Sequence, residues 1–392
     1  MERRYKIFLL ILLGVFTAFA PFINNTLGPI LASVASCFNT SVSVVNLGLT
    51  ASMIGLAAGQ LVIGPVSDKL GRRRPVLVSV ALFTLSSLAV AFSTSVSAFI
   101  ALRFVQGVGG AGGIVICRSI ATDHFKGREL MTVFAITGMI NGISPIIAPM
   151  ASGAMAGVGG WPAVFFMLAA FGLLVMAGCW RMRESLPDER RSRRSLLDTF
   201  QLYGIVVRNK QYVLYVLHQC MAMVILFGNI ASVSSILSHY GYSGEMAPSI
   251  ALSVNGVFVA LGAGGAAMFK RATAGVKASC VGMLLLSVAE AIVLFFDLGF
   301  WAYEIGLCLL LMFMGITLTA STTLALESER ELAGTASALF GAMGFVVGAL
   351  AAPLVTLGSP LRSTAVAFVA GAVCSCIFAF QAFRHTSSKE QF

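Results

Sequence analysis

The side chains that could carry chemistry in this chain are polar residues inside long apolar runs. They are Asn24, Asn25, Arg103, Gln106, His218, Gln219, Asn229, Asn255 and Glu304. Polar groups are costly to bury in an apolar segment, so each of these residues is a candidate functional residue. A carboxyl group or an imidazole in such a place can hold and release a proton, whereas an amide can only donate and accept hydrogen bonds.

Catalytic sequence patterns are absent. The four histidines do not form an H-E-x-x-H pair, and the sequence has no G-x-x-x-x-G-K-[ST] loop to hold a nucleotide. The eight cysteines lie within or at the ends of apolar runs, without the C-x-x-C spacing of a metal site, and are expected to be small buried hydrophobic residues. The sequence therefore predicts no enzyme, no metal site and no cofactor.

Composition indicates where the polar residues must lie. The 392 residues are 58% hydrophobic and 11% charged, with a mean hydropathy of +0.91, whereas soluble domains carry about 25% charged residues. The excess apolar surface has to face lipid, so the sequence predicts a protein embedded in a lipid bilayer. The net charge of +10 could indicate a nucleic-acid partner. Because aromatic-interleaved basic patches are absent, no nucleic acid is expected.

Twelve stretches are long enough to cross a bilayer as helices, since one span needs about 20 apolar residues. They run near residues 7–34, 43–66, 75–93, 97–118, 130–156, 161–180, 211–237, 247–268, 276–296, 299–326, 332–356 and 361–383. The sequence thus predicts an all-α integral membrane protein with twelve transmembrane helices.

The positions of the cations predict the orientation of these spans. With the N-terminus in the cytoplasm, every Lys and Arg except Arg103 and Arg362 falls in or beside a cytoplasmic segment. Cytoplasmic loops of membrane proteins carry an excess of Lys and Arg, so both termini are expected in the cytoplasm. The N-terminal cations and apolar run also resemble a signal peptide, but the run continues to about Val34 and is interpreted as the first span.

The longest hydrophilic stretch, residues 181–210, separates six spans from six. We therefore expect an N-terminal six-helix bundle over residues 1–180, a cytoplasmic linker over 181–210 and a C-terminal six-helix bundle over 211–392. A soluble domain is not expected elsewhere in the chain.

Arg103 is the only cation inside a predicted span, roughly 9 Å below its outer end by helical rise. A guanidinium at that depth needs a water-filled cavity or polar partners. The alternative is that its stem follows the helix and carries the charge to the outer interface. The glycines between Gly107 and Gly113 would let a neighbouring helix approach closely.

A charged loop joins the second and third spans. Its spacing G-x-x-x-D-x-x-G-R-R is formed by Gly64, Asp68, Gly71, Arg72 and Arg73, and Arg118 precedes Asp123 by five residues farther along the chain. The loop resembles the signature between helices 2 and 3 of the major facilitator superfamily (MFS). The segment from Arg103 to Gly107 resembles the fourth-helix signature of the same superfamily, whose arginine takes part in proton coupling.

The fifth span carries closely spaced glycines and prolines, namely Gly142, Pro145, Pro149 and Gly153. Each proline removes a backbone hydrogen bond and bends the helix, and the small residues could serve helix packing alone. The pattern also resembles the antiporter motif of drug exporters, in the P-x-x-x-P-x-x-x-G form of the Bcr/CflA (bicyclomycin and chloramphenicol resistance) subfamily. The resemblance covers the N-terminal half and fades in the second half.

The resemblance implies the MFS fold, with two six-helix bundles and a substrate site near mid-membrane between them. It also implies that Asp68, Arg72 and Asp123 form a charge cluster that latches the cytoplasmic gate in the outward-facing state. Asp68 would lie near a helix N-terminus, where a carboxylate is favoured.

The chain departs from the family pattern in its first span. Many of these exporters carry a proton-exchanging acid there, but the aligned position here is Asn24, followed by Asn25. Arg103 would then lack its expected acidic partner. Proton coupling would use Glu304, His218 or Glu290 instead, and Glu290 ranks last because its span is an outer support in the MFS fold. His218 and Glu290 could also be purely structural.

These observations predict a secondary active transporter that exports small molecules, drug-like or metabolite, across the inner membrane by alternating access. Protons are the expected coupling partner, in antiport, and the chain is expected to be a monomer. One alternative is an exporter of an endogenous anionic metabolite or siderophore without proton coupling. Another is a membrane sensor, which would need an output domain that this sequence lacks.

Overall fold

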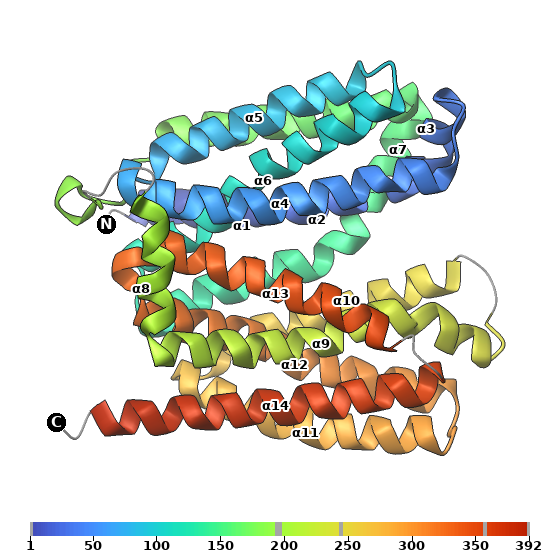
Figure 1. Cartoon of the computed structure of the whole chain (residues 1–392), viewed down its shortest axis with the longest axis vertical. Coiled ribbons are helices and arrows are strands. Elements are labelled where there is room, and N and C mark those ends of the chain that lie inside the picture. The colour runs from blue at the N-terminus through green and yellow to red at the C-terminus, as the bar shows by residue number, and fades with distance from the viewer. Residues whose placement is uncertain (1–2, 193–197, 243–245, 356–358, 390–392) are drawn as a thin grey trace. The chain divides into compact units, whose positions relative to one another are not determined.

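The computed structural model describes residues 3–192, 198–242, 246–355 and 359–389. In these residues the chain forms helices and no β-strand (Figure 1). The α-helices are α1 (Arg3–Thr17), α2 (Phe19–Asn25), α3 (Leu31–Cys37), α4 (Val42–Leu70), α5 (Arg73–Ala91), α6 (Val96–His124), α7 (Gly127–Arg181), α8 (Leu202–Arg208), α9 (Lys210–His239), α10 (Met246–Gly265), α11 (Ala272–Phe295), α12 (Phe300–Ser328), α13 (Ala333–Val355) and α14 (Pro360–Lys389). Short 3₁₀ helices are η1 (Gly28–Ile30), η2 (Asp188–Arg190), η3 (Asp198–Gln201), η4 (Ala266–Met268) and η5 (Arg330–Leu332).

Helices lie at all twelve predicted spans, and ten helical segments of the described part are long and apolar enough to cross a membrane. The first span is divided into α1, α2, η1 and α3. Pro21 leaves the carbonyl of Thr17 without its helical donor at the break between α1 and α2, and Pro29 lies in η1, at the second break. α7 covers both the fifth and the sixth spans, which meet at Gly159 and Gly160; the φ of Gly160 is +68°. Residue 356, the predicted end of the eleventh span, lies outside the described residues.

The helices form two compact units. Unit 1 comprises residues Met1–His124, Ser144–Gly204 and Arg330–Ala342. Within it α6 packs against α4 and α5. Glycines bring α4 and α6 together, because a Cβ on Gly107 would lie 2.9 Å from the backbone nitrogen of Leu56. Such close approach of small residues is how helices associate in lipid, where the hydrophobic effect does not drive them together.

Unit 2 comprises residues Phe125–Ile143, Ile205–Glu329 and Met343–Phe392. In this unit α9 packs against α12 and α14, and α11 packs against the same two helices. Their shared apolar core includes Met283, Leu311 and Phe368. α10 lies along α12, where Gly262 faces the backbone of Met312 without an intervening side chain.

Two helices pass from one unit to the other along their length. α7 belongs to unit 2 up to Ile143 and to unit 1 from Ser144, whereas α13 belongs to unit 1 up to Ala342 and to unit 2 from Met343. The division into residues 1–180, 181–210 and 211–392 stays a prediction, and residues 193–197 of that linker lie outside the described part.

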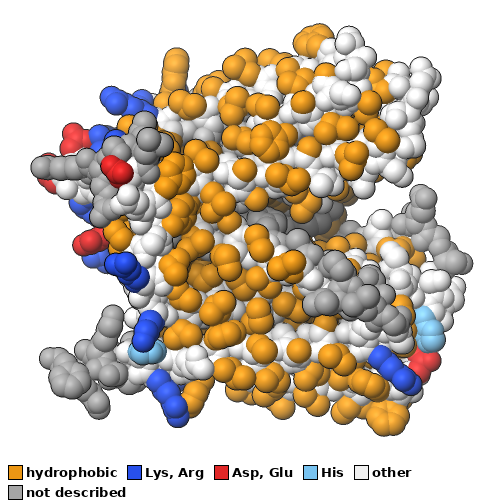
Figure 2. All heavy atoms as spheres, viewed as in Figure 1, with side chains coloured by type: hydrophobic (Ala, Val, Ile, Leu, Met, Phe, Trp, Pro, Cys, Tyr) orange, Lys and Arg blue, Asp and Glu red, His pale blue; other side chains and the backbone are white. Residues whose placement is uncertain are grey.

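The surface of each unit is apolar along the helices. Figure 2 shows hydrophobic side chains over the helix lengths, with Lys, Arg, Asp and Glu gathered at helix ends. Leu85 in unit 1 is 64% exposed and Leu285 in unit 2 is 66% exposed. An apolar surface of this extent is unsuited to water and suits lipid.

Candidate functional site

Arg72 in unit 1 is fully buried in the turn between α4 and α5. Its Nη1 donates to Asp68 Oδ1 at 2.6 Å, and its Nε donates to Asp123 Oδ2 at 3.0 Å. Burial alone would lower the pKa of the Arg72 guanidinium, but the two carboxylates outweigh burial and raise this pKa above its usual value. The structure thus brings together the three charged residues that the family resemblance singled out.

The Asp68 carboxylate also caps the start of α13. The N–H of Gly334 donates to Oδ1 at 2.9 Å, and Thr335 donates to Oδ2 through its N–H at 2.7 Å and its hydroxyl at 2.6 Å. The first N–H groups of a helix lack intrahelical partners and carry partial positive charge. A Cβ on Gly64 would lie 2.6 Å from the carbonyl oxygen of Gly334, so this glycine lets α4 and α13 meet.

Glu184 supports the same turn from the segment after α7. Its Oε1 accepts from the N–H of Arg72 at 2.7 Å, and its Oε2 accepts from the N–H of Arg73 at 3.1 Å. Arg73 in turn donates from Nη2 to the carbonyl of Trp180 at 2.6 Å. Sequence reasoning missed Glu184, because α5 lacks a capping side chain of its own and the residue that replaces one is 112 positions away. The turn itself uses Gly71, whose φ is +85°.

Arg118 lies farther along α6, and its guanidinium is 5.7 Å from the ring centroid of Phe340 in α13. Gln60 of α4 approaches the same place and is fully buried. Neither end of the Gln60 amide has a hydrogen-bond partner among the described residues. A single amide on a helix gives no sequence pattern, so the sequence alone does not identify Gln60.

Arg103 is fully buried in unit 1 and makes its hydrogen bonds within the span. Its Nη2 donates to the carbonyl of Ile23 at 2.6 Å and to Ser52 Oγ at 3.2 Å, and its Nη1 donates to Gln106 Oε1. Gln106 extends this hydrogen-bond network, because its Nε2 donates to Ser87 Oγ at 2.7 Å. Polar partners, rather than a stem that reaches the interface, therefore accommodate this guanidinium.

No carboxylate among the described residues lies within ion-pairing distance of Arg103. The nearby side-chain amides of the first span do not supply the negative charge that a carboxylate would bring. Asn24 and Asn25 are half-buried at the end of α2, and Asn24 Oδ1 lacks a hydrogen-bond partner in the described part of the chain. The positive charge of Arg103 is thus met by hydrogen-bond dipoles and by the ring of Phe165, whose centroid lies 5.8 Å from the guanidinium carbon.

The proline- and glycine-rich segment of α7 lies where this helix passes from unit 2 to unit 1. In unit 2, a Cβ on Gly142 would lie 2.7 Å from the backbone nitrogen of Ala260. In unit 1, a Cβ placed on Gly153 would have no described atom within 4 Å apart from the neighbouring backbone of its own helix. Pro149 is half-buried, and the side chain of Pro145 lies outside the described part. Only Gly142 of the two glycines therefore serves close packing.

Unit 2 contains a second polar cluster, formed by side chains of α9, α10, α11 and α12. Its members are Asn229, Asn255, Glu290, Tyr303, Glu304 and Cys308, each less than 9% exposed. The Cys308 thiol lies 3.4 Å from Asn255 Oδ1 and 3.9 Å from Glu304 Oε1, and the Tyr303 hydroxyl donates to Asn229 Oδ1 at 3.5 Å. The cluster therefore joins four residues that the sequence singled out, namely Asn229, Asn255, Glu290 and Glu304.

Glu290, ranked last from the sequence, belongs to this cluster. Gly306 of α12 has no side chain, which leaves room for the carboxyl group of Glu290. Glu304 lies close enough for its charge to act on that carboxyl group. One oxygen of each carboxyl group and the amide nitrogens of Asn229 and Asn255 have no hydrogen-bond partner among the described residues. The cluster thus has both donors and acceptors available to a ligand or to water.

His218 and Gln219 do not join that cluster. His218 is fully buried against α14, where its Nδ1 lies 2.7 Å from Ser375 Oγ and 2.9 Å from the Ser375 carbonyl oxygen. Gln219 Oε1 accepts from the hydroxyl of Thr322 at 3.3 Å. His218 therefore has the contacts of an interhelical histidine, which was one of its two interpretations.

Comparison with known proteins identifies the family. The model of the Major Facilitator Superfamily matches residues 11–353. The chain belongs to this superfamily. It is therefore a multi-pass membrane transporter and not an enzyme, and the family resemblance drawn from the loop and helix signatures is confirmed.

Several bacterial relatives cover most of the chain. An uncharacterized MFS-type transporter, YdgK of Bacillus subtilis, is 30% identical over 95% of both chains. A bicyclomycin resistance protein homolog of Haemophilus influenzae is 28% identical over 91% of this chain and 90% of its own. The multidrug transporter MdfA of Yersinia pestis is 30% identical over 54% of this chain and 52% of its own.

Solved structures show the same fold at low sequence identity. The proton:xylose symporter XylE covers 98% of this chain with a TM-score of 0.76 and 11% identity, and the alignment spans 96% of XylE. The human organic anion transporter MFSD10 covers 98% of both chains with a TM-score of 0.69 and 18% identity. These likenesses confirm the predicted MFS fold.

Proposed function

We propose that this transporter exports small drug-like or metabolite molecules across the cytoplasmic membrane, by alternating access coupled to proton antiport. The relatives named for bicyclomycin resistance and multidrug transport support this substrate class. A bacterial inner membrane agrees with the organisms of these relatives. We expect the transporter to act as a monomer.

The observation that carries the proton coupling is the pair formed by Glu290 and Glu304. Both are buried, and neither has a basic partner among the described residues. Two neighbouring carboxylates cannot both stay ionised without a cation, because burial and mutual repulsion disfavour the charged form. One of the pair would therefore hold a proton, and substrate binding would release it. Glu304 is the expected carrier because α12 lines the substrate cavity in the MFS fold.

The cluster around Arg72 supports a gate at the predicted cytoplasmic end. Asp68 links the turn between α4 and α5 to the start of α13 through three hydrogen bonds. We expect these bonds to hold while the cytoplasmic side is closed and to break when it opens, since alternating access moves one repeat against the other. Arg72 and Asp123 would keep the Asp68 carboxylate in position.

A second candidate function is the export of an endogenous anionic metabolite or siderophore without proton coupling. It is favoured by Arg103, a fully buried guanidinium with no carboxylate partner in the described part of the chain. Arginine is suited to a substrate carboxylate or phosphate, because its planar group binds such anions in a bidentate manner.

Proton release on substrate binding distinguishes the two functions. Purified protein in weakly buffered detergent is mixed with drug-like compounds and, separately, with organic anions, while a pH indicator reports released protons. We expect release from wild type and from the exposed-acid control Glu189→Gln, and none from Glu304→Gln. Binding is measured independently by calorimetry. Wild-type binding without proton release would refute antiport and favour the anion exporter.

A further inference from the structure

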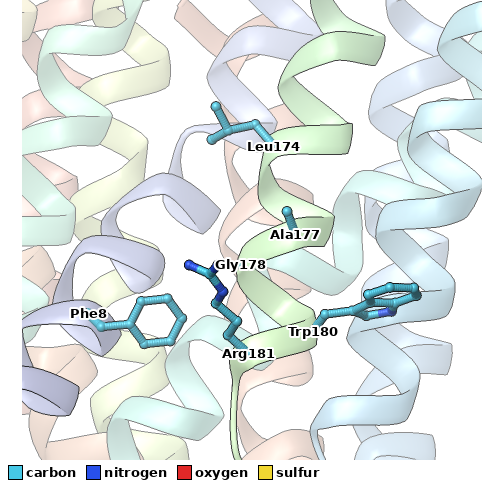
Figure 3. A pocket seen from close by; sticks show the side chains of 6 residues that line it. All are labelled: Phe8, Leu174, Ala177, Gly178, Trp180 and Arg181. Carbon is cyan, nitrogen blue, oxygen red and sulfur yellow. The ribbon is translucent and has the colours of Figure 1, made fainter.

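A groove in unit 1 lies between α1 and the last turns of α7 (Figure 3). It has a volume of about 480 Å³ and is lined by Phe8, Leu174, Ala177, Gly178, Trp180 and Arg181. Gly178 allows α1 and α7 to approach, because a Cβ there would lie 2.8 Å from Leu12 Cδ1. Small residues at two successive positions, Ala177 and Gly178, leave the groove between the helices open.

Among the described residues that line the groove, only Arg181 carries a charge. Figure 3 shows its side chain directed back along α7, so that the guanidinium lies between Phe8 and Leu174. Arg181 forms no ion pair among the described residues. A cation in the last turn suits the partial negative charge of a helix C-terminus, but that role does not require the guanidinium to turn into an apolar groove. A guanidinium in this setting suits a phosphate group, which it binds through charge-assisted hydrogen bonds.

The position of the groove indicates what kind of molecule carries the phosphate. Arg181 ends a membrane-spanning segment, and Leu174 lies seven residues earlier, about 10 Å deeper along the helix. Leu174 is 67% exposed and Trp180 at the span end is 70% exposed. Tryptophan is enriched at the level of lipid headgroups. The groove therefore fits an apolar chain of about 10 Å joined to an anionic group at the membrane surface.

We propose that this groove binds an anionic phospholipid of the adjacent leaflet, with the phosphate at Arg181 and one acyl chain along Ala177 and Leu174. None of the described lining residues is a carboxylate that could pair with the ammonium of a zwitterionic headgroup. Phosphatidylglycerol should therefore bind in preference to phosphatidylethanolamine. Arg183 adds positive charge beside the groove, since its guanidinium lies 5.3 Å from the ring of Tyr5, itself next to Phe8.

Native mass spectrometry of the full-length protein in detergent tests this proposal. The protein is titrated with phosphatidylglycerol or phosphatidylethanolamine, and bound lipids are counted. Arg181→Gln removes the charge, and Ala177→Phe fills the groove while it keeps the charge. Arg384→Gln is the matched control, because Arg384 also lies at the end of a span and 4.6 Å from an aromatic ring, that of Phe380, but outside the groove.

We expect the first phosphatidylglycerol to bind wild type and Arg384→Gln about tenfold more tightly than phosphatidylethanolamine does. Both lipids offer a phosphate to Arg181, but only phosphatidylethanolamine brings an ammonium, which lies beside this cation without a carboxylate partner among the described lining residues. Arg181→Gln and Ala177→Phe should both abolish this preference. Equal affinity of wild type for the two lipids, or an unchanged preference in Arg181→Gln, would overturn the proposal. A preference lost in Arg181→Gln but kept in Ala177→Phe would also overturn it, because general surface charge would then explain the binding.

Discussion

Asp68 is held from two directions within unit 1, and this double role sets the effect of changing it. On one side it accepts from Arg72, and on the other it accepts from the first N–H groups of α13. Arg72 is fully buried, so the carboxylates of Asp68 and Asp123, rather than water, neutralise its positive charge. Loss of one carboxylate would leave a buried cation that is only partly neutralised.

We predict that Asp68→Asn destabilises the protein by about 3 kcal/mol. This value is the lower end of the range for removing the charge of one partner of a buried ion pair. The substituted amide keeps the shape of the side chain, so the loss reports on charge rather than on volume. Thermal unfolding in detergent measures it as a lower Tm. The control is Asp188→Asn, an exposed acid paired with Arg191, where a change of less than about 1 kcal/mol is expected. Equal effects of the two substitutions would contradict the role given to Asp68.

At the scale of elements, α7 carries one proline- and glycine-rich pattern whose residues pack in different ways. Gly142 and Gly153 belong to the same proline- and glycine-rich pattern, yet they have different surroundings. A Cβ on Gly142 would meet Ala260 and the carbonyl of Gly256. A Cβ on Gly153 would meet no described atom within 4 Å outside the neighbouring backbone of its own helix. The pattern alone therefore does not show which glycine is needed for close approach of helices.

Alanine substitutions at these two glycines test this difference. Gly142→Ala should destabilise the protein by about 1–3 kcal/mol through overpacking against α10. Gly153→Ala should leave stability unchanged or raise it by about 0.5–1 kcal/mol, because glycine inside a helix is less favourable than alanine. Thermal unfolding of both variants, together with transport rates in reconstituted vesicles, measures the outcome. A larger loss at Gly153 would show that the motif acts through backbone flexibility.

At the scale of the whole molecule, the placement of charge predicts the orientation in the membrane. The basic residues gather at helix ends, and the turn from Arg72 to Arg74 and the segment after Arg181 carry several of them. Lys and Arg next to a span are retained in the cytoplasm. The same orientation would place the turn between α11 and α12, at Asp297, outside.

Reporter fusions in bacterial cells test this orientation. Alkaline phosphatase is active only outside the cytoplasm, and green fluorescent protein exported by the general secretory route does not fluoresce. A phosphatase inserted after Asp297 should be active, and the same enzyme inserted after Asp188 should be inactive. A green fluorescent protein at the C-terminus should fluoresce. Reversed activities at Asp297 and Asp188 would contradict the predicted orientation.

Much of the fold could be predicted from the sequence, because a span in lipid must satisfy its own backbone hydrogen bonds and so must be helical. The length of each apolar run is then sufficient to locate a helix. The breaks inside runs were harder to predict. Pro21 divides the first span, and Gly159 with Gly160 forms the whole connection between the fifth and sixth spans.

The candidate sites were predicted only in part. The spacing of Asp68 and Arg72 within one loop is local information, and the family signature added Asp123. Glu184, Thr335 and Gln60 could not be found in this way, since each contacts residues that are distant in sequence. The number of its span predicts a supporting role for Glu290, yet its side chain lies beside α12.

The sequence by itself determined the family, the helical class and the polar residues that lipid makes costly, because these follow from composition, run length and local motifs. Only the tertiary structure decided which polar residues meet. Helix rotation and the choice of the neighbouring helix that each glycine faces set which side chains come within hydrogen-bond distance, and spacing along one helix encodes neither. That is why Arg103 was recognised from its depth, whereas its partners at Ile23 and Ser52 had to be seen.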